Sequence, residues 1–354
     1  MDKIKKKGEL FAGQLLHWNK YENNREMPWK GEKDPYKIWL SEIILQQTRV
    51  EQGLKYYENF IREFPDINAL AAATDAKVFK LWEGLGYYSR CKNLIATAKF
   101  ISTEFNGRFP DDFQTILKLK GIGPYTAAAI ASFAYNLPYA VLDGNVFRVL
   151  SRIFDIDAPI DSRQGKNLFN KMAQDILPPD SPALYNQAIM DFGALICKPL
   201  PSCLSCFFSK ECTAYNAGRQ DLLPVKLKKA RLTERWFNYV VPVWGDQVLI
   251  HQRVGKDIWQ QLYEFLLIET GKRPEDKQLK RLLKEQYGIN EIALSDHYQR
   301  TQRLSHQLIH FSITKLKLDK KLNLPGFSWI NINEIDQYPF PKTLHDYINE
   351  KEMI

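Results

Sequence analysis

The chain has 354 residues, a length that favours two domains, because single hydrophobic cores stop growing before this size. Hydrophobic residues make up 45% and charged residues 25% of the sequence, which excludes an intrinsically disordered chain. The 49 Lys and Arg residues exceed the 41 Asp and Glu residues for a formal net charge of +8, which favours a polyanionic partner.

The chain begins with the polar, basic string MDKIKKKGEL, and the residues after it contain no apolar stretch typical of a signal peptide. The longest nearly apolar run, residues 127–135, is far shorter than the roughly 20 residues of a membrane-spanning helix. The sequence therefore predicts a cytoplasmic protein with no membrane partner.

Residues 9–215 are predicted to be mostly helical, because apolar residues recur at helical spacing between short Pro- and Gly-containing breaks. In this region the string WLSEIILQQT places Glu42 among apolar neighbours. Most helical glutamates are solvated surface charges, so this position by itself does not indicate a function.

Residues 117–130, LKLKGIGPYTAAAI, predict two helices joined by a tight turn. Gly121 and Gly123 permit backbone angles that other residues avoid, and they are expected to let backbone N–H groups approach a phosphate. An ordinary helix–helix turn has the same pattern, so both interpretations stay open. Further on, VLDGNVFRVL places Asp143 where it either caps the next helix or serves as a functional carboxylate.

Cys197, Cys203, Cys206 and Cys212 lie within sixteen residues, with the spacing C-x5-C-x2-C-x5-C. In a reducing compartment, thiols at this density predict metal binding rather than disulfides. Four thiolates suit either a structural zinc ion or a [4Fe–4S] cluster. A single C-x2-C inside one compact loop favours the cluster, because zinc sites more often join two such pairs through a longer arm.

Beyond Cys212 the composition changes to a basic, polar stretch that includes KLKKARLTER, which predicts a linker at 218–235. Strand-like stretches at 238–245, 247–254 and 308–318, with a helical pattern at 276–286, predict an α+β second domain. We expect a helical domain at 1–217 and a smaller α+β domain at 236–354.

The strings WLSEIILQQTRV, LWEGLGYYSR, LKGIGPYTAAAI and VLDGNVFRVL, followed by the four cysteines, occur together and in order. This combination resembles the MutY type of adenine DNA glycosylase, in the helix-hairpin-helix superfamily that includes endonuclease III. The resemblance covers roughly residues 10–215 and implies two helical lobes with duplex DNA in the cleft, plus a Nudix-like C-terminal domain. We expect a monomer with one [4Fe–4S] cluster per chain, associated with the nucleoid through DNA binding.

The resemblance also implies roles for individual residues. Glu42 corresponds to the general acid that protonates the departing adenine, and Asp143 to the carboxylate that stabilises the oxocarbenium-like sugar. Asn145 is implied to hold the polar network of the site. Tyr125 stands where bifunctional relatives carry a Schiff-base lysine, and a phenol cannot form an imine, so little strand-nicking activity is expected.

The implied substrate is duplex DNA in which adenine lies opposite 8-oxoguanine or guanine. The residues implied or expected to contact DNA are Gln46, Gln47, Thr48, Leu85, Tyr87, Gly121, Gly123, Ser305 and His306. Two departures from the family pattern stand out: the cysteine loop lacks one residue of the usual C-x6-C, and Leu304 replaces the aromatic before Ser305. Residues 281–288 lack a glutamate-rich Nudix box, so pyrophosphate hydrolysis is not expected.

Two alternatives stay open at this point. One is a glycosylase for another mispaired or oxidised base, and Tyr125 together with the extra domain disfavours its endonuclease III version. The other is a noncatalytic DNA-binding module that uses the cluster as a scaffold, in which Glu42 and Asp143 would have no chemical role.

Overall fold

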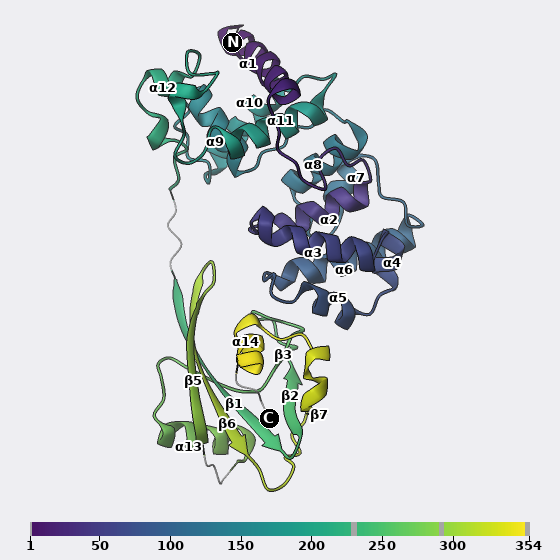
Figure 1. Cartoon of the computed structure of the whole chain (residues 1–354), viewed down its shortest axis with the longest axis vertical. Helices are drawn as coiled ribbons and strands as arrows, with labels where there is room; N and C mark the ends of the chain where they lie inside the picture. Colours follow the sequence, from purple (N-terminus) through teal and green to yellow (C-terminus); the bar gives the residue numbers. More distant parts are fainter. Residues whose placement is uncertain (1, 228–231, 290–293, 351–354) are drawn as a thin grey trace. The chain divides into compact units, whose positions relative to one another are not determined.

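The computed structural model describes residues 2–227, 232–289 and 294–350 (Figure 1). Contacts divide the chain into two compact units. The first unit comprises residues 1–72 and 93–228, and the second comprises residues 73–92 and 229–354. A short stretch from within the helical half of the sequence therefore belongs to the second unit.

The first unit is helical, as the sequence predicts. Its helices are α1 (Asp2–Tyr21), α2 (Pro35–Leu45), α3 (Val50–Glu63), α4 (Ile67–Ala72), α7 (Phe113–Lys118), α8 (Pro124–Tyr135), α9 (Gly144–Ile153), α10 (Arg163–Asp175), α11 (Pro182–Leu195) and α12 (Thr213–Asn216). Helix α6 (Tyr88–Glu104) begins in the second unit and continues in the first. Short 3-10 turns follow at Cys203–Ser205 and Gln220–Leu222.

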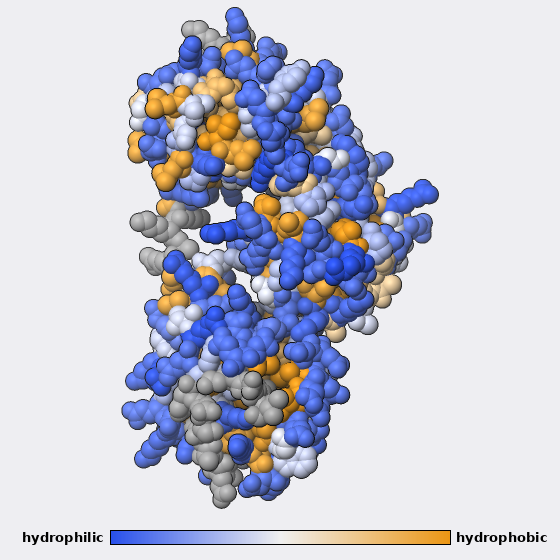
Figure 2. Space-filling model, in the orientation of Figure 1, coloured by the Kyte–Doolittle hydropathy of each residue, from blue (hydrophilic) through white to orange (hydrophobic). Residues whose placement is uncertain are grey.

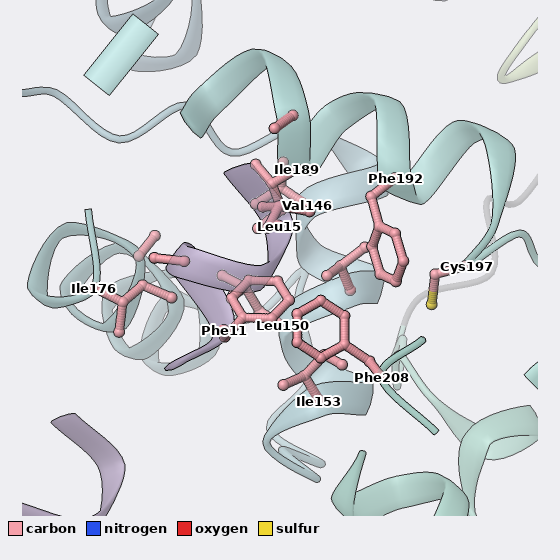
Figure 3. Packing of buried hydrophobic residues seen from close by; sticks show 14 of the residues in the cluster. Phe11, Leu15, Val146, Leu150, Ile153, Ile176, Ile189, Phe192, Cys197 and Phe208 are labelled. Carbon is pink, nitrogen blue, oxygen red and sulfur yellow. The ribbon is translucent and has the colours of Figure 1, made fainter. Parts of the chain in front are cut away.

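A core of aromatic and branched side chains joins α1, α9, α11 and the cysteine loop (Figure 3). The Phe11 ring of α1 packs on Phe208 of the loop with ring centroids 4.7 Å apart, and Phe192 of α11 lies 5.7 Å from the same ring. Helix α9 contributes Leu150, which is fully buried. The loop that carries the cysteines is thus packed against the helix that Asp143 precedes.

The predicted helix–turn–helix at 117–130 is confirmed as α7, a turn and α8. Gly121 has φ +79, and a Cβ there would lie 2.6 Å from Cβ of Asn93, so this position requires glycine. Gly123 does not use the backbone angles that glycine permits. Its φ is −97 and a Cβ would meet open space, so Gly123 leaves the start of α8 accessible instead.

The second unit contains a mixed sheet in the strand order β3-β2-β1-β6-β5, with β4 paired to β1 and β7 paired to β2. The strands are β1 (Thr233–Trp244), β2 (Gln247–Gln252), β3 (Tyr263–Glu264), β4 (Leu266–Thr270), β5 (Leu294–Arg303), β6 (Gln307–Lys317) and β7 (Phe327–Asn331). Strands β1 and β6 are parallel, and the other pairs are antiparallel.

Three helices complete this unit, namely α5 (Asp75–Trp82), α13 (Asp276–Tyr287) and α14 (Lys342–Glu350), with a 3-10 turn at Ile332–Gln337. Leu279 and Leu283 of α13 pack on a cluster that includes Val240 of β1. The predicted α+β class is confirmed, together with the strands at 238–245, 247–254 and 308–318. Strands β3, β4 and β7 were not predicted from the sequence.

The first part of the expected linker packs on the first unit. Leu223 is buried, the Arg219 guanidinium bonds the Asp155 carboxylate at 3.0 Å, and the Ile160 N–H donates to the Val225 carbonyl at 3.0 Å. Residues 228–231 of that linker lie outside the described residues, and β1 begins at Thr233. Residues 218–227 are therefore part of a folded unit.

The visible surface is mostly hydrophilic, with small apolar groups that include one over the region of α12 (Figure 2). Leu200 and Leu204 of the cysteine loop are among the exposed apolar side chains. Within the described residues, no helix combines the length and the apolar character that a membrane span requires.

We expect two Leu→Ala changes, one in the core between α9 and α11 and one outside it, to differ strongly in their effect on the free energy of unfolding. Leu150→Ala is expected to lower the free energy of unfolding of the first unit by about 2–5 kcal/mol, because a buried leucine leaves a cavity. Leu168→Ala, at a side chain of α10 that is 44% exposed, is the matched control and is expected to stay within about 0.5 kcal/mol. Urea unfolding followed by circular dichroism measures both, and equal losses would contradict this account of the core.

Candidate active site

A cavity of about 800 Å³ opens in the first unit among α2, α8, α9, α11 and the loop between α1 and α2. Seven residues that the sequence singled out line it, namely Glu42, Gln46, Gln47, Thr48, Tyr125, Asp143 and Asn145. These residues come from three separate segments of the chain, residues 42–48, 125 and 143–145, so the fold brings them together.

Glu42 lies on α2, a helix buried along most of its length, and its side chain is 9% exposed. Burial raises the pKa of Glu42 to about 7, the Tyr125 hydroxyl hydrogen-bonded to it acts in the opposite direction, and the nearby Asp143 raises it further. A carboxyl group with this pKa keeps its proton in a large fraction of molecules at neutral pH. It is therefore suited to donate a proton.

Asp143 is the N-cap of α9, since its Oδ1 accepts a hydrogen bond from the Val146 N–H at 2.7 Å. Its Oδ2 accepts a second bond from Nδ2 of Asn145 at 2.7 Å. Burial raises the pKa of Asp143, and these hydrogen bonds oppose that shift. The side chain thus caps the helix and also lines the cavity that contains Glu42.

Arg148 connects this carboxylate to the cysteine loop. Its Nη2 donates to Oδ1 of Asn145 at 2.7 Å and to the Gly193 carbonyl at 2.8 Å, and its Nε donates to the Cys197 carbonyl at 2.8 Å. Because Oδ1 of Asn145 receives the guanidinium, the amide must turn its Nδ2 toward Asp143. A path of hydrogen bonds therefore runs from the loop backbone to the site carboxylate.

The four clustered cysteines line one small cavity beside α9 and α11. Arg152 lies next to it and donates to the Lys198 carbonyl at 2.6 Å, the Pro199 carbonyl at 3.0 Å and Sγ of Cys197 at 3.6 Å. Among the described residues no group of three or more His, Cys, Asp or Glu side chains is arranged to hold a single metal ion. Four thiols around one cavity, beside a fixed cation, are a donor set that fits an iron–sulfur cluster.

A buried carboxylate at Asp191 of α11, which was not predicted from the sequence, anchors the loop between α1 and α2. This carboxylate is fully buried and accepts bonds from Asn23 at 2.8 Å, Arg25 at 2.8 Å, Lys30 at 3.1 Å and Gln187 at 3.0 Å. Three of these partners come from the loop between α1 and α2. A charged residue inside the apolar run PALYNQAIMDFGAL was the only available signal, because a buried carboxylate needs partners.

The anchor shapes one wall of the cavity. The wall residues supplied by this loop and by α11 include Arg25, Met27, Trp29, Lys30, Gln187 and Met190. A carboxylate only accepts hydrogen bonds, so Gln187 must present its Nε2 to Asp191, which leaves Oε1 as the acceptor for a ligand.

The remaining expected residues lie outside this cavity. Gly121 and Gly123 form the hairpin turn of the first unit. In the second unit, the side chain of Tyr87 is 40% exposed, whereas that of Leu85 is only 5% exposed. An inserting wedge needs exposure, and in this conformation Tyr87 meets that need and Leu85 does not.

Ser305 and His306 form the two-residue turn between β5 and β6, closed by a bond of 2.8 Å from the Leu304 N–H to the Gln307 carbonyl. Both are exposed. The Tyr87 hydroxyl donates to Oγ of Ser305 at 3.1 Å, so two of the expected DNA-contacting residues touch each other within the second unit.

Residues 40–176 match the model of the HhH-GPD superfamily of base excision DNA repair proteins, and residues 238–350 match the NUDIX domain model. The adenine DNA glycosylase of Buchnera aphidicola subsp. Schizaphis graminum is 34% identical over 305 residues, which cover 86% of this chain and 85% of that protein. The chain belongs to the adenine DNA glycosylase family. It is therefore a base excision repair enzyme with adenine DNA glycosylase function.

Further relatives and solved structures match a smaller share of the chain. The human adenine DNA glycosylase is 37% identical over 223 residues, covering 60% of this chain and 41% of the human protein. Among solved structures, a thermostable thymine-DNA glycosylase superposes with a TM-score of 0.56 at 28% identity, over 60% of this chain and 98% of its own. Endonuclease III bound to DNA, at 18% identity and a TM-score of 0.52, shows the same fold.

Helices α11 and α9 approach each other closely at Gly193 and Asn145, so a substitution at Gly193 can test whether the position of Asn145 matters for adenine release. A Cβ at Gly193 would lie 2.7 Å from Cβ of Asn145, so Gly193→Ala is expected to displace Asn145 and slow adenine release tenfold or more. Gly13→Ala on α1, where a Cβ meets open space, is the matched control and should leave the rate unchanged. Single-turnover release of adenine measures both, and a Gly193→Ala rate within twofold of the native rate would refute the role of this contact.

Proposed function

We propose that this enzyme hydrolyses the N-glycosidic bond of adenine mispaired with 8-oxoguanine or guanine in duplex DNA. Family membership supports adenine as the excised base. The observation that carries the chemistry is that the carboxyls of Glu42, on α2, and Asp143, at the N-cap of α9, line one cavity. The cavity is large enough for a nucleotide that has been turned out of the helix.

Glu42 is proposed as the general acid. Adenine is a poor leaving group until one of its ring nitrogens is protonated, and the proton comes from the Glu42 carboxyl as the C–N bond breaks. The hydroxyl of Tyr125 holds that carboxyl in place. Because Tyr125 is a phenol rather than an amine, no imine forms with the sugar and the enzyme is monofunctional, with little lyase activity.

Asp143 is proposed to stabilise the positive charge that develops on the sugar as the base departs. The Val146 N–H and the Asn145 amide fix the orientation of its two oxygens before substrate arrives. Water then adds to C1′ of the sugar, its proton passes to the Glu42 carboxylate that protonated the adenine, and an abasic site is left. Holding the carboxylate in advance removes the cost of reorganising it during the reaction.

Gln187 is proposed to favour adenine over bases that carry a carbonyl group at the same edge. Its Nε2 is committed to Asp191, so Oε1 is left to accept a hydrogen bond from an exocyclic amino group. A carbonyl at that edge would place two acceptors face to face, and a buried unpaired polar group is costly.

We propose one [4Fe–4S] cluster per chain, held by Cys197, Cys203, Cys206 and Cys212. When bound, it supplies a rigid crosslink that closes the loop. The chain's own contribution is the backbone carbonyls of that loop, which hold Arg148 and Arg152.

Recognition of the base opposite adenine is proposed to lie in the second unit, at the exposed turn of Ser305 and His306. A hydroxyl and an imidazole both form hydrogen bonds with the edge of an oxidised guanine, worth about 1–3 kcal/mol for each good contact. Further DNA contacts are proposed from Gln46, Gln47, Thr48, Leu85, Tyr87, Gly121 and Gly123. We further propose a monomer that resides in the cytoplasm and reaches the nucleoid through DNA.

A glycosylase for another base is the alternative, and substrate comparison separates the two. Duplexes with adenine opposite 8-oxoguanine, adenine opposite guanine and thymine opposite guanine are compared under single-turnover conditions. The proposal requires adenine release from the first two and none of thymine from the third. A noncatalytic DNA-binding module is not supported, because the family consists of enzymes.

Glu42→Gln is expected to slow adenine release by about 10²–10⁴-fold while duplex binding is retained, because the amide has the same shape and no acidic proton. In the native enzyme the rate should fall as pH rises through about 7, since the acid loses its proton above its pKa. Tyr125→Phe removes a hydrogen bond that lowers the pKa of Glu42, so the fall should move to higher pH. A rate that is level between pH 6 and 9, or Glu42→Gln activity within about tenfold of native, would contradict the assignment.

Purified protein is expected to be brown and to contain about four irons per chain by metal analysis. Cys203→Ser combined with Cys206→Ser should give colourless or insoluble protein, because two of four ligands are lost. Cys91→Ala, which changes the cysteine outside the loop, should keep its iron. Stoichiometric zinc without iron after anaerobic purification would overturn the cluster.

A further inference from the structure

Glu83 lies at the end of α5, where it is the C-cap residue, and its side chain is 10% exposed. It belongs to the stretch 73–92, which contacts identify as part of the second unit. Neither the family's motifs nor the proposed chemistry assigns it a role. Its position, two residues before Leu85, makes its contacts relevant to the loop that is proposed to contact DNA.

The Glu83 carboxylate accepts hydrogen bonds from two separate segments of the chain. Its Oε1 accepts a hydrogen bond from the backbone N–H of Phe340 at 2.7 Å, and its Oε2 accepts one from Lys80 at 2.6 Å and lies 3.8 Å from Nε2 of His345. Phe340 is buried and stacks on Phe265 with ring centroids 5.4 Å apart, so the donor is held firmly. Charge-assisted hydrogen bonds of this kind are stronger than neutral ones when solvent is mostly excluded.

The loop after Glu83 is internally braced. Nε1 of Trp82 donates to the Gly86 carbonyl at 2.9 Å, and Arg90 donates to the Leu85 carbonyl at 3.4 Å. Tyr87 sits at the end of this loop with φ +47, a conformation that an unbraced tyrosine rarely keeps. Fixing Glu83 therefore also fixes Tyr87, whose hydroxyl meets Ser305.

The segment that binds Glu83 is also tied to the strand that leads to Ser305. In α14, which follows Phe340 in the chain, Thr343 donates to Oε1 of Gln302 at 2.8 Å and Asp346 pairs with Arg300 at 2.7 Å. Gln302 and Arg300 are on β5, directly before the turn. The contacts form a closed circuit from Glu83 through α14 and β5 to Ser305, and back through Tyr87.

We propose that Glu83 is a positioning residue that holds Tyr87 against Ser305 and so sets the preference for 8-oxoguanine over guanine opposite adenine. It acts through these two side chains, because its own carboxylate is bound by protein groups. This inference rests on the proposed function, in which the second unit reads the opposite base. A turn that is held by contacts on both sides distinguishes 8-oxoguanine from guanine better than a turn without such contacts, since a good hydrogen bond needs correct geometry.

The test measures, in the full-length protein, the ratio of single-turnover rates of adenine release opposite 8-oxoguanine and opposite guanine. Glu83→Ala is expected to reduce this ratio tenfold or more. Glu83→Gln keeps an acceptor for the Phe340 N–H and should restore most of it. Ser305→Ala should give a similar loss, and the double variant Glu83→Ala with Ser305→Ala should lose little more, because the two act on one contact. Glu285→Ala, in an exposed pair on α13, is the matched control.

A ratio that stays native in Glu83→Ala overturns the inference, and so does an equal fall of both rates, which would indicate a general structural role. Additive losses in the double variant also overturn it. If Glu83→Ala does not fold, Glu83→Asp withdraws the carboxylate from Phe340 by one methylene and should show the same fall. If the native enzyme shows no preference for 8-oxoguanine over guanine, the proposed recognition of the opposite base is wrong. If the native enzyme shows that preference and the Glu83 variants keep it, only this inference is wrong.

Discussion

The Arg148 guanidinium joins the cysteine loop to the candidate active site. It is bonded on one side to the Cys197 and Gly193 carbonyls and on the other to Asn145, whose amide then has only one orientation available for Asp143. Because these groups are partly buried, leaving any of them unpaired carries a desolvation cost. The position of the Asp143 carboxylate therefore depends on the conformation of a loop more than fifty residues further along the chain.

Hydrogen-bond partners also explain why the two carboxyl groups of the cavity have different environments. Asp143 has a helix N-terminus and an amide to stabilise its charge. Glu42 lies on a helix of mostly apolar neighbours and has the Tyr125 hydroxyl as its hydrogen-bond partner, so burial dominates and its pKa rises. Two groups of the same chemical type are thereby given different environments, which is the condition for dividing acid and electrostatic roles between them.

Recognition of the opposite base obeys a different constraint, because the side chains proposed for it lie on turns. Ser305 and His306 are exposed and have little packing of their own. Their position is fixed instead by β5, by α14 and by the Tyr87 hydroxyl. Mobile turns become selective only when neighbouring rigid elements hold them, and the bonds of Glu83 are part of that support.

Local patterns in the sequence were sufficient to predict the helical half, the hairpin at 117–130, the cysteine loop, the α+β second domain and the strings that carry Glu42 and Asp143. Helical spacing, turn residues and ligand spacing extend over a few residues, so they can be recognised in the sequence without knowledge of the fold. Only the tertiary structure showed that Asp191 anchors a cavity wall with Arg25, that Gly123 needs no special backbone angle, and that Leu85 is buried. Each of these depends on contacts or backbone angles that the linear pattern does not encode. Arg25, for example, is bonded to Asp191 across 166 residues of the chain.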